Sequence, residues 1–88
     1  MAVTTSKITC PAGVYTAIAT AATNVSFRIK EMLKTTQVRL AVAASAPAAS
    51  STDYVAVSDR KWKEFGELTD NMYIMPVGAN AILEVMKG

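Results

Sequence analysis

The stretch VSFRIK at residues 25–30 and the stretch QVRLAV at residues 37–42 decide the fold class. Every second residue in both stretches is apolar, namely Val25, Phe27, Ile29, Val38, Leu40 and Val42. A period of two places one set of side chains on a buried face and the other set in solvent, which is typical of β-strands. We expect the two strands to form a hairpin, with residues 34–36 as the connection.

Short β-prone segments recur along the rest of the chain. They are residues 7–10, 14–20, 54–57, 72–75 and 81–86. Clusters of Pro, Gly, Asn and Asp separate them and mark turns. The last two segments flank one such cluster and predict a second hairpin. The whole pattern predicts an all-β fold, a small β-sandwich or jelly-roll-like barrel of about 6–8 short antiparallel strands.

Two stretches leave a helical alternative open. Residues 17–33 also contain apolar residues at helical spacing, but a helix there would point Phe27 away from the apolar stripe. Thr, Asn and Ser are poor interior helix formers as well, so strands are favoured. In the second stretch Trp62 and Phe65 are three residues apart, which fits a short helical turn near Trp62 as well as a bulged strand.

The chain is expected to be a single β domain over residues 1–88. Residues 1–6 are small and polar without periodicity, and they predict an extended N-terminal arm. Residues 43–53 are rich in Ala, Ser and Pro and predict a surface loop. The chain start lacks the apolar core of a signal peptide, and no apolar run reaches the ~20 residues of a membrane span. We therefore expect synthesis in the cytoplasm and no membrane partner.

Composition indicates that the domain is stabilised by association. A domain of 88 residues buries only roughly 60–65% of its unfolded surface, so its stability margin is thin. Cys10 is the single cysteine and there is no histidine, which rules out an internal disulfide and argues against a structural zinc site. Charged residues make up 18% of the chain, below the usual quarter or so. Oligomerisation remains as the source of stabilisation.

The residues that usually perform catalysis are missing. Without histidine the commonest general base and the usual partner of a Ser or Cys nucleophile are absent. No phosphate-binding glycine run, dinucleotide fingerprint or calcium-loop spacing occurs. We expect no enzymatic activity, no cofactor and no metal. The nine basic residues are scattered, and the one dense patch, residues 60–63, is typical of a solvated strand edge, which argues against nucleic acid.

The candidate interface residues are Val3, Thr4, Thr5, Trp62, Tyr54 and Tyr73. The first three lie in the expected arm, which could add to the sheet of a neighbour. Trp62 stands alone among charged residues, so it is either a lid on the core or an interface anchor. Tyr54 and Tyr73 stand at strand starts, where an apolar ring and a wet hydroxyl both find a place.

Several short strings give the chain a resemblance to a known family. They are VRLAV at 38–42, ASAPAASSTDY at 44–54, VAV at 55–57, FGELTDNMYIMP at 65–76 and GANAILEV at 78–85. With the strand rhythm around them, these strings resemble small bacteriophage virion proteins of the head-decoration or cement type. The resemblance covers roughly residues 14–86 and contains no catalytic signature.

The resemblance implies a β-sandwich that sits on the outer surface of the phage head, often as a trimer. Its partner would be the major capsid protein, whose subunits it would bridge and stabilise, so its location would be the virion. Two alternatives stay open: a tail, neck or fibre component, and a β-module that binds single-stranded nucleic acid or carbohydrate through Trp62, Tyr54 and Tyr73.

Overall fold

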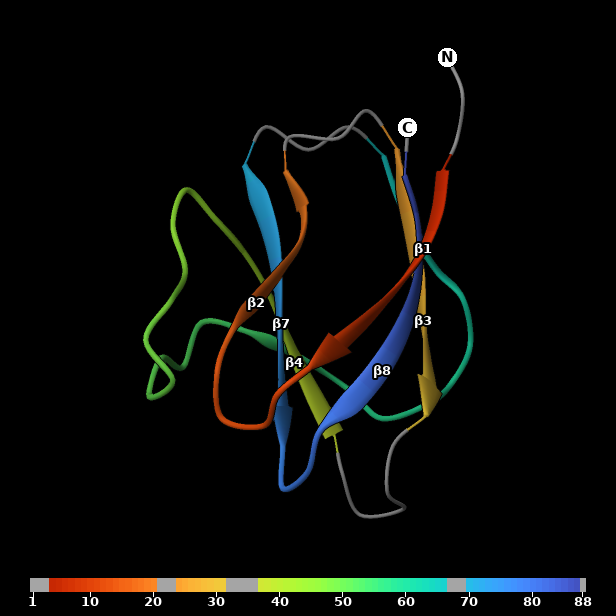
Figure 1. Cartoon of the computed structure of the whole chain (residues 1–88). Coiled ribbons are helices and arrows are strands. Elements are labelled where there is room, and N and C mark those ends of the chain that lie inside the picture. Colours follow the sequence, from red (N-terminus) through yellow and green to blue (C-terminus); the bar gives the residue numbers. More distant parts are fainter. Residues whose placement is uncertain (1–3, 21–23, 32–36, 67–69, 88) are drawn as a thin grey trace.

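The computed structural model describes residues 4–20, 24–31, 37–66 and 70–87, and these form eight strands and no helix. The strands are β1 (Thr4–Cys10), β2 (Thr16–Thr20), β3 (Val25–Glu31), β4 (Gln37–Ala43), β5 (Val55–Val57), β6 (Lys63–Phe65), β7 (Asn71–Val77) and β8 (Ala81–Lys87). Sheet A has the order β1-β8-β3-β6 and sheet B the order β2-β7-β4-β5 (Figure 1). All pairings are antiparallel. The predicted all-β sandwich is confirmed.

The strand order is that of a jelly roll, in which two four-stranded sheets share a double Greek-key path. Consecutive strands lie in opposite sheets at every step except β4 to β5. The chain therefore passes back and forth across the core. Among the described strands, β4 and β5 are the one pair of consecutive strands that lie in the same sheet. Every other ladder joins strands that are separated in the sequence by a strand of the other sheet, so the two sheets form together.

The core forms where the alternating apolar residues of the two sheets meet. In β3, Val25, Phe27 and Ile29 are at most 1% exposed, as the period of two predicts. They belong to one cluster of buried residues with Cys10, Ile18, Ala19, Val38, Leu40, Val57, Met72, Ile74, Ala81, Leu83 and Val85. The Phe27 ring stacks on Phe65 with 6.0 Å between ring centroids. Phe65 thereby attaches the short edge strand β6 to the core.

Both predicted hairpins are wrong, although the strands themselves are where the sequence placed them. β3 lies in sheet A and β4 in sheet B, and the same is true of β8 and β7. The expected connection at residues 34–36 lies outside the described residues. Alternation tells which face of a strand is buried, but it does not distinguish a neighbour in the same sheet from a partner across the core.

The helical alternatives are wrong for the described residues. Phe27, which a helix over residues 17–33 would leave outside the apolar stripe, is fully buried in β3. Near Trp62 the chain is extended, because Lys63–Phe65 pairs with Val25–Phe27. The strand conformation gives Phe65 its contact with Phe27, which a helical turn would not align with the ladder.

Residues 4–6, which the sequence assigned to an extended arm, belong to strand β1. Strand β1 begins at Thr4, because β8 offers pairing partners as far as Lys87, which lies opposite Thr4. Val3 lies outside the described residues. The loop between β4 and β5 covers residues 44–54, with Ala43 as the last residue of β4. It projects from sheet B on the side away from sheet A (Figure 1).

Truncating Phe27 tests the central packing. We expect Phe27→Ala to lower the free energy of unfolding by about 3–5 kcal/mol, because it leaves a cavity between the sheets. Urea denaturation followed by circular dichroism measures this. The control is Val14→Ala: Val14 is 56% exposed, so its change stays within about 0.5 kcal/mol. Equal effects of the two substitutions would contradict the described core.

Cys10 makes the stability dependent on alkaline pH. Burial raises the pKa of its thiol from 9.0 to about 11, while a hydrogen bond with Thr16 acts in the opposite direction. Between these values the unfolded thiol releases a proton that the folded thiol keeps, so stability is lost as pH rises. We expect the free energy of unfolding to fall by ~2–3 kcal/mol through this window.

The comparison of native protein with Cys10→Ala isolates this contribution, since Lys and Tyr residues ionise in both. Denaturation at a series of pH values measures it. The native protein should lose more stability than the variant between pH 9.0 and about 11. Parallel pH profiles of the two proteins would refute the assignment.

Candidate interaction surfaces

The structure places the predicted interface residues on different faces of the sandwich. Trp62 contacts Arg28, whose side chain leaves sheet A on the face opposite the core. Tyr73 lies on the outer face of sheet B, because its neighbours Met72 and Ile74 point into the core. Thr5 is exposed on β1, at the far edge of sheet A from β6. These residues do not form one surface.

An ion pair and an indole ring organise the outer face of sheet A. Arg28 lies directly opposite Glu84, and its Nε donates to Glu84 Oε1 at 2.7 Å. The guanidinium of Arg28 lies 5.1 Å from the centre of the Trp62 ring, in cation–π geometry. Trp62 remains 41% exposed. It is therefore a surface aromatic residue held by a charged neighbour, and it does not close the core.

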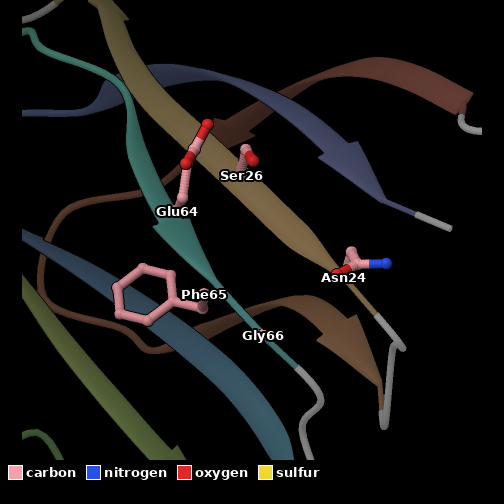
Figure 2. Close-up of a pocket in the computed structure, with 5 residues that line it drawn as sticks. All are labelled: Asn24, Ser26, Glu64, Phe65 and Gly66. Atoms are coloured by element: carbon pink, nitrogen blue, oxygen red, sulfur yellow. The ribbon is translucent and has the colours of Figure 1, made fainter.

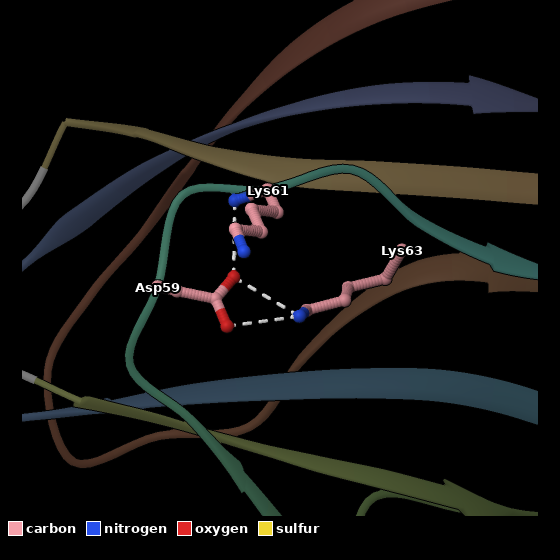
Figure 3. A network of polar contacts seen from close by, with 3 residues as sticks. All are labelled: Asp59, Lys61 and Lys63. Carbon is pink, nitrogen blue, oxygen red and sulfur yellow. Dashed lines mark hydrogen bonds and ion pairs between the residues drawn. The ribbon is translucent and has the colours of Figure 1, made fainter.

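A small polar network fixes the segment that precedes β6. Asp59 accepts a hydrogen bond from the backbone N–H of Lys61 at 3.0 Å and a second from Lys63 Nζ at 3.0 Å (Figure 3). The bond from Lys63 and then the bond from Lys61 lower the pKa of Asp59, so the carboxylate stays charged. Trp62 lies between the two lysines in the chain. The network thus limits the conformations available to the backbone that presents the indole.

A hollow of about 390 Å³ lies at the junction of β3 and β6. Its lining residues are Asn24, Ser26, Glu64, Phe65 and Gly66 (Figure 2). Ser26 and Glu64 are register partners, so their side chains share a face of the sheet, and Figure 2 shows them side by side. A Cβ at Gly66 would meet no atom of the described residues within 4 Å.

The outer face of sheet B holds a second buried cluster. Tyr15, Ala41, Tyr73 and Met75 pack together, apart from the main core. Arg39 lies with its guanidinium 4.3 Å from the centre of the Tyr54 ring. The hydroxyl of Tyr15 is buried without a hydrogen-bond partner among the residues that the structure describes. Burial raises the pKa of Tyr15, Arg39 lowers it and Tyr54 raises it. The Tyr15 hydroxyl accordingly keeps its proton.

The loop at residues 44–54 begins and ends beside this cluster. Asn71 Nδ2 donates to the carbonyl of Ala44 at 3.3 Å and to the Tyr73 hydroxyl at 3.2 Å, which ties the loop start to β7. Val42 and Val55 stand at its two ends and are 50% and 63% exposed. Their register partners Met72 and Leu40 are core residues, so both valines lie on the inner face of sheet B, at its margin. We call Val42, Tyr54, Val55 and residues 44–54 the loop surface. It combines exposed apolar side chains with small residues.

The aromatic residues do not form a stacking platform in the part of the chain that the structure describes. Phe27 is in the core and Phe65 stacks on it, while Trp62 and Tyr54 contact arginines on opposite sheets. Within residues 4–20, 24–31, 37–66 and 70–87 no three potential metal ligands cluster. The same residues include no helix long and apolar enough to span a membrane.

Sequence reasoning missed the polar residues that complete these surfaces. The alternation predicts Ser26, Arg28 and Arg39 on the solvent side of their strands, and nothing in the sequence assigns a partner to Glu64. Their importance comes from pairing: Ser26 meets Glu64 across β3 and β6, and Arg28 meets Glu84 across β3 and β8. A strand order deduced from the sequence would have placed them, but alternation alone provides no such order.

Comparisons with known proteins give no match: no family model, no curated protein and no solved structure matches this chain.

Proposed function

We propose that the protein is a structural bacteriophage virion protein, a decoration or cement protein that binds the outer head surface. The observation that supports this most is the strand order β1-β8-β3-β6 with β2-β7-β4-β5. Jelly rolls of this kind recur in viral capsid domains. The support is an analogy at the level of the fold, and the resemblance in the short strings points the same way.

The loop surface is the part of the protein that we propose to contact the capsid shell. Val42 and Val55 expose apolar area at the base of a loop made mostly of Ala, Ser and Thr. The cluster beneath the loop, which contains Tyr15, Tyr73 and Met75, is buried and gives the loop an apolar base. In this proposal the loop surface faces the shell and bridges neighbouring subunits of the major capsid protein.

Association would also supply the stability that a small domain lacks. The protein would act as a homo-oligomer, with a trimer favoured, so that several weak contacts bind together. The edge strands, β1 and β6 in sheet A and β2 and β5 in sheet B, offer backbone groups for pairing. Light scattering gives the mass of the assembly in solution and with heads.

Placing a charge on the loop surface tests the proposal. Val55→Asp would put a carboxylate into the contact, and we expect it to weaken binding to purified undecorated heads at least about tenfold. Co-sedimentation measures the binding, and calorimetry measures the rise in head melting temperature that the native protein produces. Because Val55 is 63% exposed, the stability of the free protein should change by less than about 0.5 kcal/mol.

Val14→Asp is the matched control. Val14 is 56% exposed and precedes β2, at the opposite edge of sheet B from β5. It should bind heads as the native protein does. Failure of the native protein to sediment with heads, without any rise in melting temperature, would refute the proposal. A copy number that matches tail or neck positions would assign the protein to that part of the virion instead.

A further inference from the structure

We propose that the outer face of sheet A carries a saccharide-binding site formed by Trp62 and the hollow beside it. This site lies apart from the loop surface, so it is independent of the proposed contact with the shell. Trp62 supplies an exposed aromatic surface, and Asn24, Ser26 and Glu64 supply hydrogen-bonding groups. The ligand class is a neutral, hydroxyl-rich oligosaccharide.

The strand geometry places the two parts of the site together. Trp62 and Glu64 are two residues apart on an extended segment, which puts them on one face about 7 Å apart along the chain. Ser26 and Arg28 are likewise two residues apart on β3 and share one face. Arg28 contacts Trp62, and Ser26 is the register partner of Glu64. The indole and the hollow are thus adjacent on the same outer surface.

The polar groups of the hollow are available to a ligand. Within the described part of the chain, the side chains of Asn24, Ser26 and Glu64 make no hydrogen bond to another residue. A carboxylate accepts hydrogen bonds, whereas an amide and a hydroxyl both donate and accept. This mixture matches sugar hydroxyls, which also do both. The C–H face of a sugar ring can lie on the indole, which combines an apolar face with a polar edge.

The charges around the hollow favour a neutral ligand. Arg28 is paired with Glu84, and Lys63 is paired with Asp59. The remaining lining charge is the carboxylate of Glu64, which would repel phosphates and other anions. The positive charges of Arg28 and Lys63 nearby weaken the attraction of the Glu64 carboxylate for cations. A hydroxyl-rich molecule needs neither a free cation nor an excess of acidic groups.

The site is held in place before any ligand arrives. Arg28 supports one side of the indole, and the Asp59 network fixes the backbone on either side of Trp62. Ser26 and Glu64 stand on paired strands, and Phe65 fastens β6 to Phe27. A site that is ordered in advance loses less conformational freedom on binding.

The test uses titration of the full chain with maltohexaose, cellohexaose, chitohexaose and mannohexaose. Trp62 is the only tryptophan, so its fluorescence reports on this site alone. We expect at least one sugar to shift the emission in a saturable manner, with a dissociation constant of about 1 mM or tighter. Amide signals of residues 24–28 and 62–66 should move in the heteronuclear NMR spectrum during the same titration.

Variants assign the binding to the named side chains, with calorimetry as the readout. Trp62→Ala should abolish binding, and Glu64→Gln should weaken it about tenfold or more, the loss typical of a hydrogen bond to a charged group. Glu31→Gln is the matched control, an exposed carboxylate at the opposite end of β3 from Asn24, and it should bind as the native protein does. Gly66→Leu adds a side chain to a residue that lines the hollow and should weaken binding, and its Cβ would meet no atom of the described residues within 4 Å.

Several results would overturn the proposal. One is the absence of a saturable change with all four sugars at about 10 mM. Another is binding that persists unchanged in both Trp62→Ala and Glu64→Gln. Saturable binding of oligo-dT or of acetyl-lysine amide in place of the sugars would assign the surface to another ligand class. Head binding distinguishes this proposal from the previous one, because Trp62→Ala should still bind heads and Val55→Asp should still bind the sugar.

Discussion

The fold depends on the contact between the two inner sheet faces, with Phe27 at its centre. In this contact, the apolar side chains of each sheet pack against apolar side chains of the other sheet. Strand β3 shows the arrangement, because its apolar residues enter the core while Ser26 and Arg28 remain outside. The outer residues can then meet partners from distant parts of the chain, such as Glu64 and Glu84. The surfaces are a consequence of the packing.

The sequence predicts the strands better than it predicts their partners. Alternation over Val25–Glu31 and Gln37–Ala43 is strong enough to identify both strands. It predicts the buried residues of β3 correctly, but in β4 only Val38 and Leu40 are buried as expected, whereas Val42 is 50% exposed. It assigned them to one hairpin, whereas they belong to opposite sheets. A short connection permits either arrangement, and the apolar face is buried in both. The information that decides between them lies in contacts such as Phe27 with Phe65, which are far apart in the sequence.

The candidate surfaces were predictable only in part, for the same reason. Trp62 stands out as a lone aromatic residue among charges, and Tyr54 and Tyr73 stand out at strand starts. Their neighbours do not, because Arg28 and Arg39 look like ordinary solvent-side residues of a strand. The structure gives each arginine an aromatic partner, on opposite faces of the sandwich. The aromatic residues that the sequence singled out therefore lie on two distinct surfaces.

Strand β8 has a consequence for the order in which the protein folds. It is near the end of the sequence, yet it lies in the middle of sheet A, between β1 and β3. During synthesis β1 and β3 have no mutual ladder to form until residues 81–87 have left the ribosome. Pairings over such long separations fold slowly, because the loop entropy is lost before the contacts form. The two central ladders of sheet A therefore form only once β8 is available, because β8 is the strand that joins β1 to β3.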